Sequence, residues 1–218
     1  NWEYFQNNLI EIKSNISDNV QLVAVSKTKP IKNINAAYKT GQLHFGENKI
    51  QELVSKHDVL PKDIKWHMIG HLQSNKVKYI ASFIHLIHSV DSMKLIKEIN
   101  KQALKNDKII NILIQIDISN DGSKFGFSID DINSIIYNNE LSVFESVRIN
   151  GFMGMASFTS DKNLIRNQFT SLNKLFKKHR KALSLNVLSM GMSADYKIAI
   201  ECNSNLIRLG STIFGERK

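Results

Sequence analysis

The stretch NVLSMGMSADYKIAIECNSNLIRLGS, residues 186–211, contains the pattern that decides the fold. It predicts an apolar strand ending at Ser189, a glycine turn at Gly191, a short helix, and a second apolar strand ending at Gly210. Each strand therefore ends in a turn of small residues with exposed backbone N–H groups. Such turns and the starts of helices favour anions, above all phosphate.

The same alternation of apolar strand and amphipathic helix extends over the whole chain. Strands are expected at residues 20–26, 43–45, 64–69, 84–90, 109–118, 147–153, 186–189 and 205–209. Helices are expected at residues 2–16, 30–40, 48–56, 73–82, 91–105, 129–138 and 162–183, with a shorter one before the last strand.

Apolar strands that alternate with amphipathic helices predict a parallel sheet covered by helices. Eight such units in 218 residues, with one extra helix in front, predict a single α/β domain over residues 1–218, a (β/α)₈ TIM barrel. An open, doubly wound sheet is the alternative, but no Gly-x-Gly-x-x-Gly turn follows the first strand.

Composition excludes several classes of protein. The single cysteine rules out an internal disulfide framework and fits a cytoplasmic protein, and no apolar run approaches the ~20 residues that span a membrane. The net charge of +9 is compatible with nucleic acid, but the lysines are scattered and no aromatic residues alternate with them. The densest basic run, residues 177–181, closes a predicted helix, where cations complement the helix dipole. We therefore expect neither nucleic acid nor a membrane as a partner.

In a barrel of this kind the functional face lies at the carboxyl ends of the strands, and a phosphate often binds after the seventh and eighth. Ser193 follows the seventh predicted strand, and Gly210 and Ser211 follow the eighth. They are therefore candidate phosphate ligands. The alternative is that the glycines are ordinary turn residues and Ser193 only caps a helix.

Two cationic side chains complete the candidate site. Lys27 follows the first predicted strand with the same parity as Val23 and Val25, so an amine facing the interior would be partly desolvated and nucleophilic. The alternative is a solvated loop lysine. Arg208 interrupts an apolar strand, and a buried guanidinium needs a carboxylate or a ligand atom as its partner. A reactive amine, a guanidinium and a phosphate site together indicate a phosphorylated aldehyde as cofactor.

No metal site is expected. His67 and His71 lack further ligands at a suitable spacing, and we expect His67 to make a structural hydrogen bond. Cys202 lies near the end of the last predicted helix, where a small core residue fits.

Several motifs, in order along the chain, resemble those of the pyridoxal phosphate homeostasis protein family. They are Leu22–Pro30, Phe45–Asn48 with Gln51 and Glu52, Trp66–Gly70, Leu72–Lys76, Ser123 and Lys124 with Gly126, Gly151–Met153, Leu188–Ser193, Ile207–Gly210 and Ile213–Gly215. That family is similar in fold to the N-terminal barrel domain of alanine racemase.

The resemblance implies pyridoxal 5'-phosphate as the cofactor. It implies that Lys27 is the Schiff-base lysine, that Arg208 faces the pyridine nitrogen, and that Ser193, Gly210 and Ser211 hold the phosphate. It also places Asn48 and Met153 near the ring. Two positions depart from the family: Ser211 replaces a threonine, and Asn203-Ser204 replaces Gly-Ser, where asparagine tolerates the left-handed turn.

The function that this resemblance implies is intracellular homeostasis of pyridoxal phosphate, which a monomer would bind and supply to apo-enzymes without catalytic turnover. Related racemases carry a further β-domain with a catalytic tyrosine, and we expect none here. A fold-type III racemase or decarboxylase is the first alternative, and a phosphate-binding barrel without this cofactor is the second.

Overall fold

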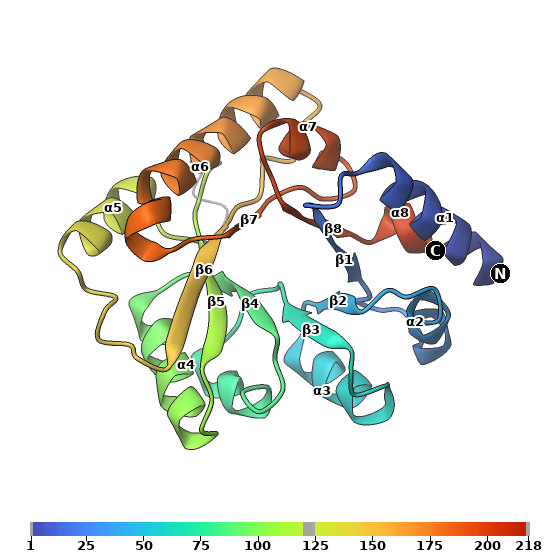
Figure 1. The fold of residues 1–218 in the computed structure, drawn as a ribbon, viewed down its shortest axis with the longest axis horizontal. Coiled ribbons are helices and arrows are strands. Elements are labelled where there is room, and N and C mark those ends of the chain that lie inside the picture. Colours follow the sequence, from blue (N-terminus) through green and yellow to red (C-terminus); the bar gives the residue numbers. More distant parts are fainter. Residues whose placement is uncertain (1, 120–124, 217–218) are drawn as a thin grey trace.

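The structure, a computed structural model, describes residues 2–119 and 125–216. Eight parallel strands form a closed barrel in the order β1 to β8, and helices surround it (Figure 1). The strands are β1 (Gln21–Val25), β2 (His44–Glu47), β3 (Lys65–Met68), β4 (Leu86–Val90), β5 (Ile110–Gln115), β6 (Val147–Met153), β7 (Val187–Ser189) and β8 (Leu206–Leu209). The helices are α1 (Trp2–Asn15), α2 (Ile31–Tyr38), α3 (Ile50–Val59), the 3₁₀ helix η1 (Ser74–Tyr79), α4 (Met93–Lys105), α5 (Ile129–Tyr137), α6 (Lys162–Leu183), α7 (Tyr196–Glu201) and α8 (Ser211–Phe214). The predicted (β/α)₈ barrel is confirmed.

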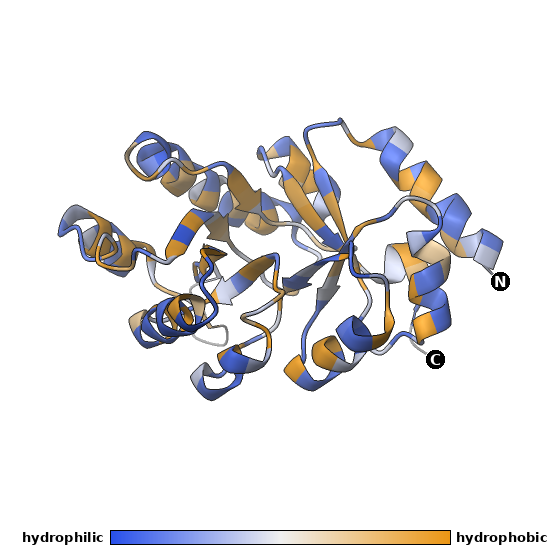
Figure 2. Ribbon diagram, turned by 60° about the horizontal axis from the view of Figure 1, so that its bottom comes forward, coloured by the Kyte–Doolittle hydropathy of each residue, from blue (hydrophilic) through white to orange (hydrophobic). Residues whose placement is uncertain are grey.

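Three helices, α4, α5 and α6, begin at a residue whose side chain caps the helix. The Ser92 hydroxyl accepts a hydrogen bond from the Leu95 amide at the start of α4, and the Asp161 carboxylate caps α6. Along α6 the predicted apolar face is buried, including Phe169 and Leu172. Hydrophobic residues run along the strands and hydrophilic ones alternate with them on the helices (Figure 2), as expected for helices that cover a barrel.

Side chains of alternate parity pack into two separate cores. Val23, Leu113 and Leu206 belong to a small cluster inside the barrel. Their neighbours in sequence, such as Leu22 and Ile207, pack in the larger core between barrel and helices. The alternation therefore determines which strand residues face the barrel interior. Interior-facing residues at the ends of the strands lie at the openings of the barrel.

Strand β2 differs from the prediction, which ended it at Phe45 because glycine usually breaks a strand. Gly46 instead lies within β2 and pairs with Val25 and His67. A Cβ atom there would approach Val23 and Ile69 to 3.1 Å, so the crowded interior favours glycine at this position.

Two helices also differ from the prediction. The segment expected as a helix over residues 73–82 contains only the 3₁₀ helix η1, and the last strand is followed by the four-residue helix α8. Helix α1 packs beside α8 (Figure 1): the Asn8 amide donates to the Ile213 carbonyl at 2.9 Å, and Phe5 meets Phe214 edge to face. Within residues 2–119 and 125–216, no helix has the length and hydrophobicity to cross a membrane.

Candidate cofactor-binding site

A cavity of about 650 Å³ opens at the carboxyl ends of the strands. Five of the predicted site residues line it: Lys27, Ser193, Arg208, Gly210 and Ser211. Lys27 follows β1, Arg208 lies in β8, and the other three lie in the turn after β7 and at the start of α8. Strand β1 pairs directly with β8. Its volume lies in the range of small-molecule sites. The closed barrel thus brings together residues that are far apart in sequence.

Arg208 is buried at the base of this cavity, with 3% of its surface exposed. Its Nη2 donates to the Gly154 carbonyl at 3.3 Å, and its Nε has no hydrogen-bond partner among the residues that the structure describes. Burial lowers the pKa of the guanidinium to about 10, although the Asp195 carboxylate raises it. The side chain therefore stays cationic at neutral pH and keeps one donor for a ligand.

Lys27 follows β1 by two residues and is half-buried in the wall of the cavity, which the buried Val25 also lines. Val23 faces the barrel interior, so the parity predicted from the sequence agrees with the position of Lys27. The backbone on both sides of Lys27 is fixed. The Ser26 amide donates to the Gly46 carbonyl at 3.0 Å, and Thr28 adopts a left-handed conformation with φ of 65°.

Three charged residues beneath this segment were missed as functional residues from the sequence. Lys56 donates to the Ser26 carbonyl at 2.7 Å and to the carboxylates of Glu47 and Glu52 at 2.5 and 2.7 Å. Glu52 in turn accepts a hydrogen bond from the Thr28 amide at 2.6 Å. This network holds both neighbours of Lys27 and so orients the lysine.

The buried carboxylate in this network has an altered acidity. Burial raises the pKa of Glu47 to about 7, although the hydrogen bonds from Lys56 and Ser26 lower it. The signal that could have identified the network was the motif containing Glu47 and Glu52. It supported the family resemblance, but no role followed from it.

The turns after β7 and β8 are tied together. The Ser193 hydroxyl accepts a hydrogen bond from the Thr212 amide at 3.3 Å. Gly191 has φ of +108°, and a Cβ atom there would lie 2.8 Å from that of Ala199, so this turn requires glycine. At Gly210 the atom nearest to a Cβ would be that of Val25, at 3.4 Å, which is ordinary van der Waals contact. The protein's own packing therefore does not require glycine at position 210, whereas close approach of a ligand to the backbone would.

The remaining predicted residues lie away from the cavity lining. Met153 is fully buried in the interior cluster, and Asn48 lies in the loop after β2, next to Gly70. Neither is among the residues that line the cavity, so their contact with a cofactor stays a prediction. Ser123 and Lys124 lie outside the described residues.

Other expectations about single residues are confirmed. Asn203 adopts the left-handed conformation, with φ of 75°, and Cys202 is a buried residue at the end of α7. His67 makes structural hydrogen bonds, with Nε2 2.8 Å from His44 Nδ1 and Nδ1 2.8 Å from His88 Nε2.

The chain is similar to known proteins over almost its whole length. The sequence model of the family described as alanine racemase, N-terminal domain, matches residues 1–218. A pyridoxal phosphate homeostasis protein of Pasteurella multocida is 35% identical over 228 residues, covering 97% of each chain. One from Aquifex aeolicus is 35% identical over 202 residues, covering 91% of this chain and 87% of the relative.

Solved structures with the same fold include PipY and an alanine racemase. PipY from Synechococcus elongatus, solved with PLP bound, superimposes with a TM-score of 0.88 at 31% identity, covering 97% of this chain and all (100%) of PipY. An alanine racemase from Clostridium difficile superimposes with a TM-score of 0.81 at 13% identity, covering 99% of this chain and 57% of the racemase. The racemase comparison supports the fold alone.

Proposed function

This chain belongs to the pyridoxal phosphate homeostasis protein family, and we propose that it binds pyridoxal 5'-phosphate (PLP), buffers it and supplies it to apo-enzymes. The observation that carries the proposal is the cavity in which Lys27, just after β1, and Arg208, in the neighbouring strand β8, lie beside the turns of Ser193 and Gly210. The PLP-bound structure of PipY supports the same ligand.

The chemistry that PLP supplies is an aldehyde, which a primary amine captures reversibly as a Schiff base with loss of water. Lys27 presents its amine in the cavity wall. The contacts of Lys56 with Ser26 and of Glu52 with Thr28 limit the positions that this amine can reach. Capture through Lys27 is reversible, which suits a protein that holds its ligand and gives it up.

Arg208 is suited to face the ring nitrogen. Its unpartnered Nε–H is a donor, and an unprotonated pyridine nitrogen is an acceptor. Because the pKa of Arg208 is about 10, the guanidinium remains charged and opposes protonation of the ring nitrogen. An unprotonated ring withdraws electrons weakly, so this arrangement favours holding the ligand over transforming it.

The phosphate would bind at the two joined turns. Ser193 and Ser211 supply hydroxyl groups, and Gly210 lets the backbone approach the ligand closely. Several hydrogen bonds to a dianion are strong, because each is assisted by charge. The turns therefore account for selectivity toward a phosphorylated aldehyde.

We further propose that the protein is a non-catalytic monomer. Two-base proton transfer needs an acid or base on each face of the substrate. The sequence has five tyrosines, all within the described residues, and none lines the cavity. The five predicted site residues that line the cavity all belong to one chain, which supports binding of PLP by a monomer.

The test compares wild type with Lys27→Ala and with Lys29→Ala, a matched control because Lys29 also lines the cavity. Wild type and the control should bind PLP with a visible absorbance band and activate an apo-enzyme, whereas Lys27→Ala should lose the band. Loaded protein incubated with L-amino acids should show no sustained change of chirality or release of carbon dioxide. Multiple turnover on any amino acid would overturn the carrier function in favour of a racemase or decarboxylase.

A further inference from the structure

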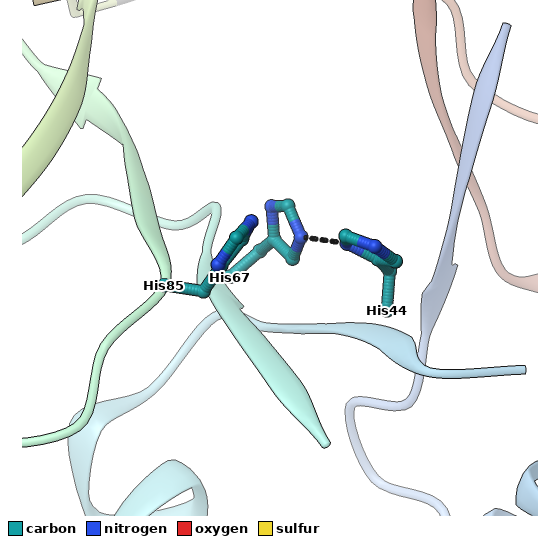
Figure 3. A group of neighbouring side chains, drawn as sticks. All are labelled: His44, His67 and His85. Carbon is teal, nitrogen blue, oxygen red and sulfur yellow. Dashed lines mark hydrogen bonds between the residues drawn. The ribbon is translucent and has the colours of Figure 1, made fainter. Parts of the chain in front are cut away.

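The opposite, amino-terminal end of the barrel contains a cluster of three histidines. His44 is the first residue of β2, His67 lies in β3, and His85 immediately precedes β4. These three strands are neighbours in the barrel, so the three imidazoles converge (Figure 3). One ring nitrogen of each lies within 4.8 Å of those of the other two.

We propose that His44, His67 and His85 form a binding site for a divalent transition metal of the zinc class. Imidazole nitrogens are preferred ligands of zinc, copper and nickel, whereas magnesium and calcium prefer oxygen. Ligands at zinc–nitrogen distances of about 2.0–2.1 Å lie roughly 3.3 Å apart in a tetrahedral site. His44 Nδ1 and His67 Nε2 are 2.8 Å apart, and one nitrogen of each of the three rings lies within 4.8 Å of the other two. These separations bracket the tetrahedral spacing, so rotation of the side chains can bring three nitrogens to a metal.

The surroundings of His67 match those of a metal-bound histidine. A ligating imidazole usually donates its other N–H to an acceptor, which fixes the tautomer. His67 Nδ1 is 2.8 Å from His88 Nε2, and His88 Nδ1 is 3.0 Å from the Ser189 hydroxyl. With a proton on Nδ1 of both His67 and His88, His67 donates to His88 and His88 donates to the Ser189 hydroxyl. The Nε2 lone pair of His67 then points toward His44.

A cavity of about 290 Å³ leaves room for a fourth ligand. It is lined by the three histidines and by a ring of amide side chains, among them Asn111. The buried Oδ1 atom of Asn111 has no hydrogen-bond partner in the described part of the chain. It can accept a hydrogen bond from a metal-bound water, which would complete a site with three protein ligands and one solvent ligand.

Two lysines are charged neighbours of the cluster: Lys65 acts on both His44 and His85, and Lys13 acts on His44. Their positive charges weaken the attraction of the site for a dication, so binding depends on direct bonds from the imidazole nitrogens.

The experiment titrates chelator-treated full-length protein with Zn²⁺ and Co²⁺ by calorimetry and visible spectroscopy. We expect one ion for each chain, the visible bands of tetrahedral Co²⁺, and no binding of Mg²⁺. His44→Gln and His85→Gln, at partly buried positions, should weaken Zn²⁺ binding at least about 100-fold, more than the loss of an outer partner does. His71→Gln is the matched control, because His71 is exposed and contacts Asp91 instead. It should bind Zn²⁺ as wild type does.

X-ray absorption at the zinc edge of the wild-type protein decides the question even if a variant fails to fold. Three imidazole ligands at about 2.0–2.1 Å would support the site. Fewer imidazoles, absence of stoichiometric binding, or equal Zn²⁺ affinity in His85→Gln and wild type would overturn it. PLP plays no part in these measurements, so they are independent of the proposed function.

Discussion

Replacing Arg208 by methionine should stabilise the PLP-free protein and at the same time weaken PLP binding. The guanidinium is buried, its Nε has no partner among the described residues, and its hydrogen bond to the Gly154 carbonyl is long at 3.3 Å. A residue that is costly in the empty protein and useful in the loaded one is expected at a binding site.

The size of the effect follows from the acidity of Arg208. Burial lowers its pKa to about 10, and at about 1.4 kcal/mol for each tenfold loss of proton affinity, holding the charge there costs about 3 kcal/mol. Loss of the hydrogen bond to Gly154 returns about 1 kcal/mol of that. The free energy of unfolding should therefore rise by about 2 kcal/mol, and Tm by roughly 4–8 °C. Exchange of a buried ion for an apolar residue often has this sign.

The assay is urea unfolding of both proteins after removal of PLP, with PLP affinity measured in parallel. Affinity should fall about 10- to 100-fold, which is the loss of one hydrogen bond from a charged donor. The matched control is Arg166→Met, because Arg166 is exposed and its ion pair with Glu201 should contribute less than about 1 kcal/mol. A loss of stability of more than about 1 kcal/mol in Arg208→Met would refute the reasoning, since the guanidinium would then stabilise the empty protein.

Three further predictions concern the turns, the network beneath Lys27 and the effect of acid. Gly210→Val should leave the circular dichroism spectrum unchanged, because the atom nearest to a Cβ there is 3.4 Å away, but should weaken PLP binding more than tenfold (~1.4 kcal/mol). Pyridoxal without phosphate should bind wild type much more weakly than PLP does, and equal affinities would contradict the phosphate site. Lys56→Met leaves the Glu47 carboxylate buried without its cation and should lower the free energy of unfolding by about 3–5 kcal/mol. The loss should be smaller near pH 6 than near pH 8, because Glu47 takes up a proton at the lower pH. An unchanged stability in urea unfolding would contradict a structural role for the network. Burial lowers the pKa of His179, so the unfolded chain takes up a proton at a higher pH than the folded chain does. The stability that is present above about pH 6.5 therefore falls as the pH drops through the folded pKa. His179→Gln should make this fall shallower in urea unfolding measured across pH, and an unchanged slope would exclude the contribution of His179.

The architecture was predictable because the periodicity of apolar residues marks every strand. Where the prediction failed, local propensity gave way to packing. Gly46 was expected to end β2, but the crowding of Val23 and Ile69 against it makes glycine the residue that fits within the strand. The segment before β4 has helical composition, yet only the 3₁₀ helix η1 forms there.

The candidate site was predictable in part. Lys27 and Arg208 were identified because a polar residue at a strand end, or within an apolar strand, is costly unless it has a role. The role of Lys56 was not predictable, because its side chain reaches Ser26 across the space between α3 and β1. The histidine cluster was missed for a similar reason. The separations of His44, His67 and His85 in sequence resemble no metal motif, and only the pairing of neighbouring strands brings the rings together.

The most direct test of PLP binding through Lys27 is reduction of the loaded protein with borohydride, followed by peptide mapping. Reduction makes the bond between amine and ligand permanent, so the added mass marks the lysine that held the aldehyde. The account predicts the mass on Lys27, which lines the same cavity as Ser193 and Gly210. Label on Lys29 or Lys76 instead, or no label on a protein that binds PLP, would contradict it.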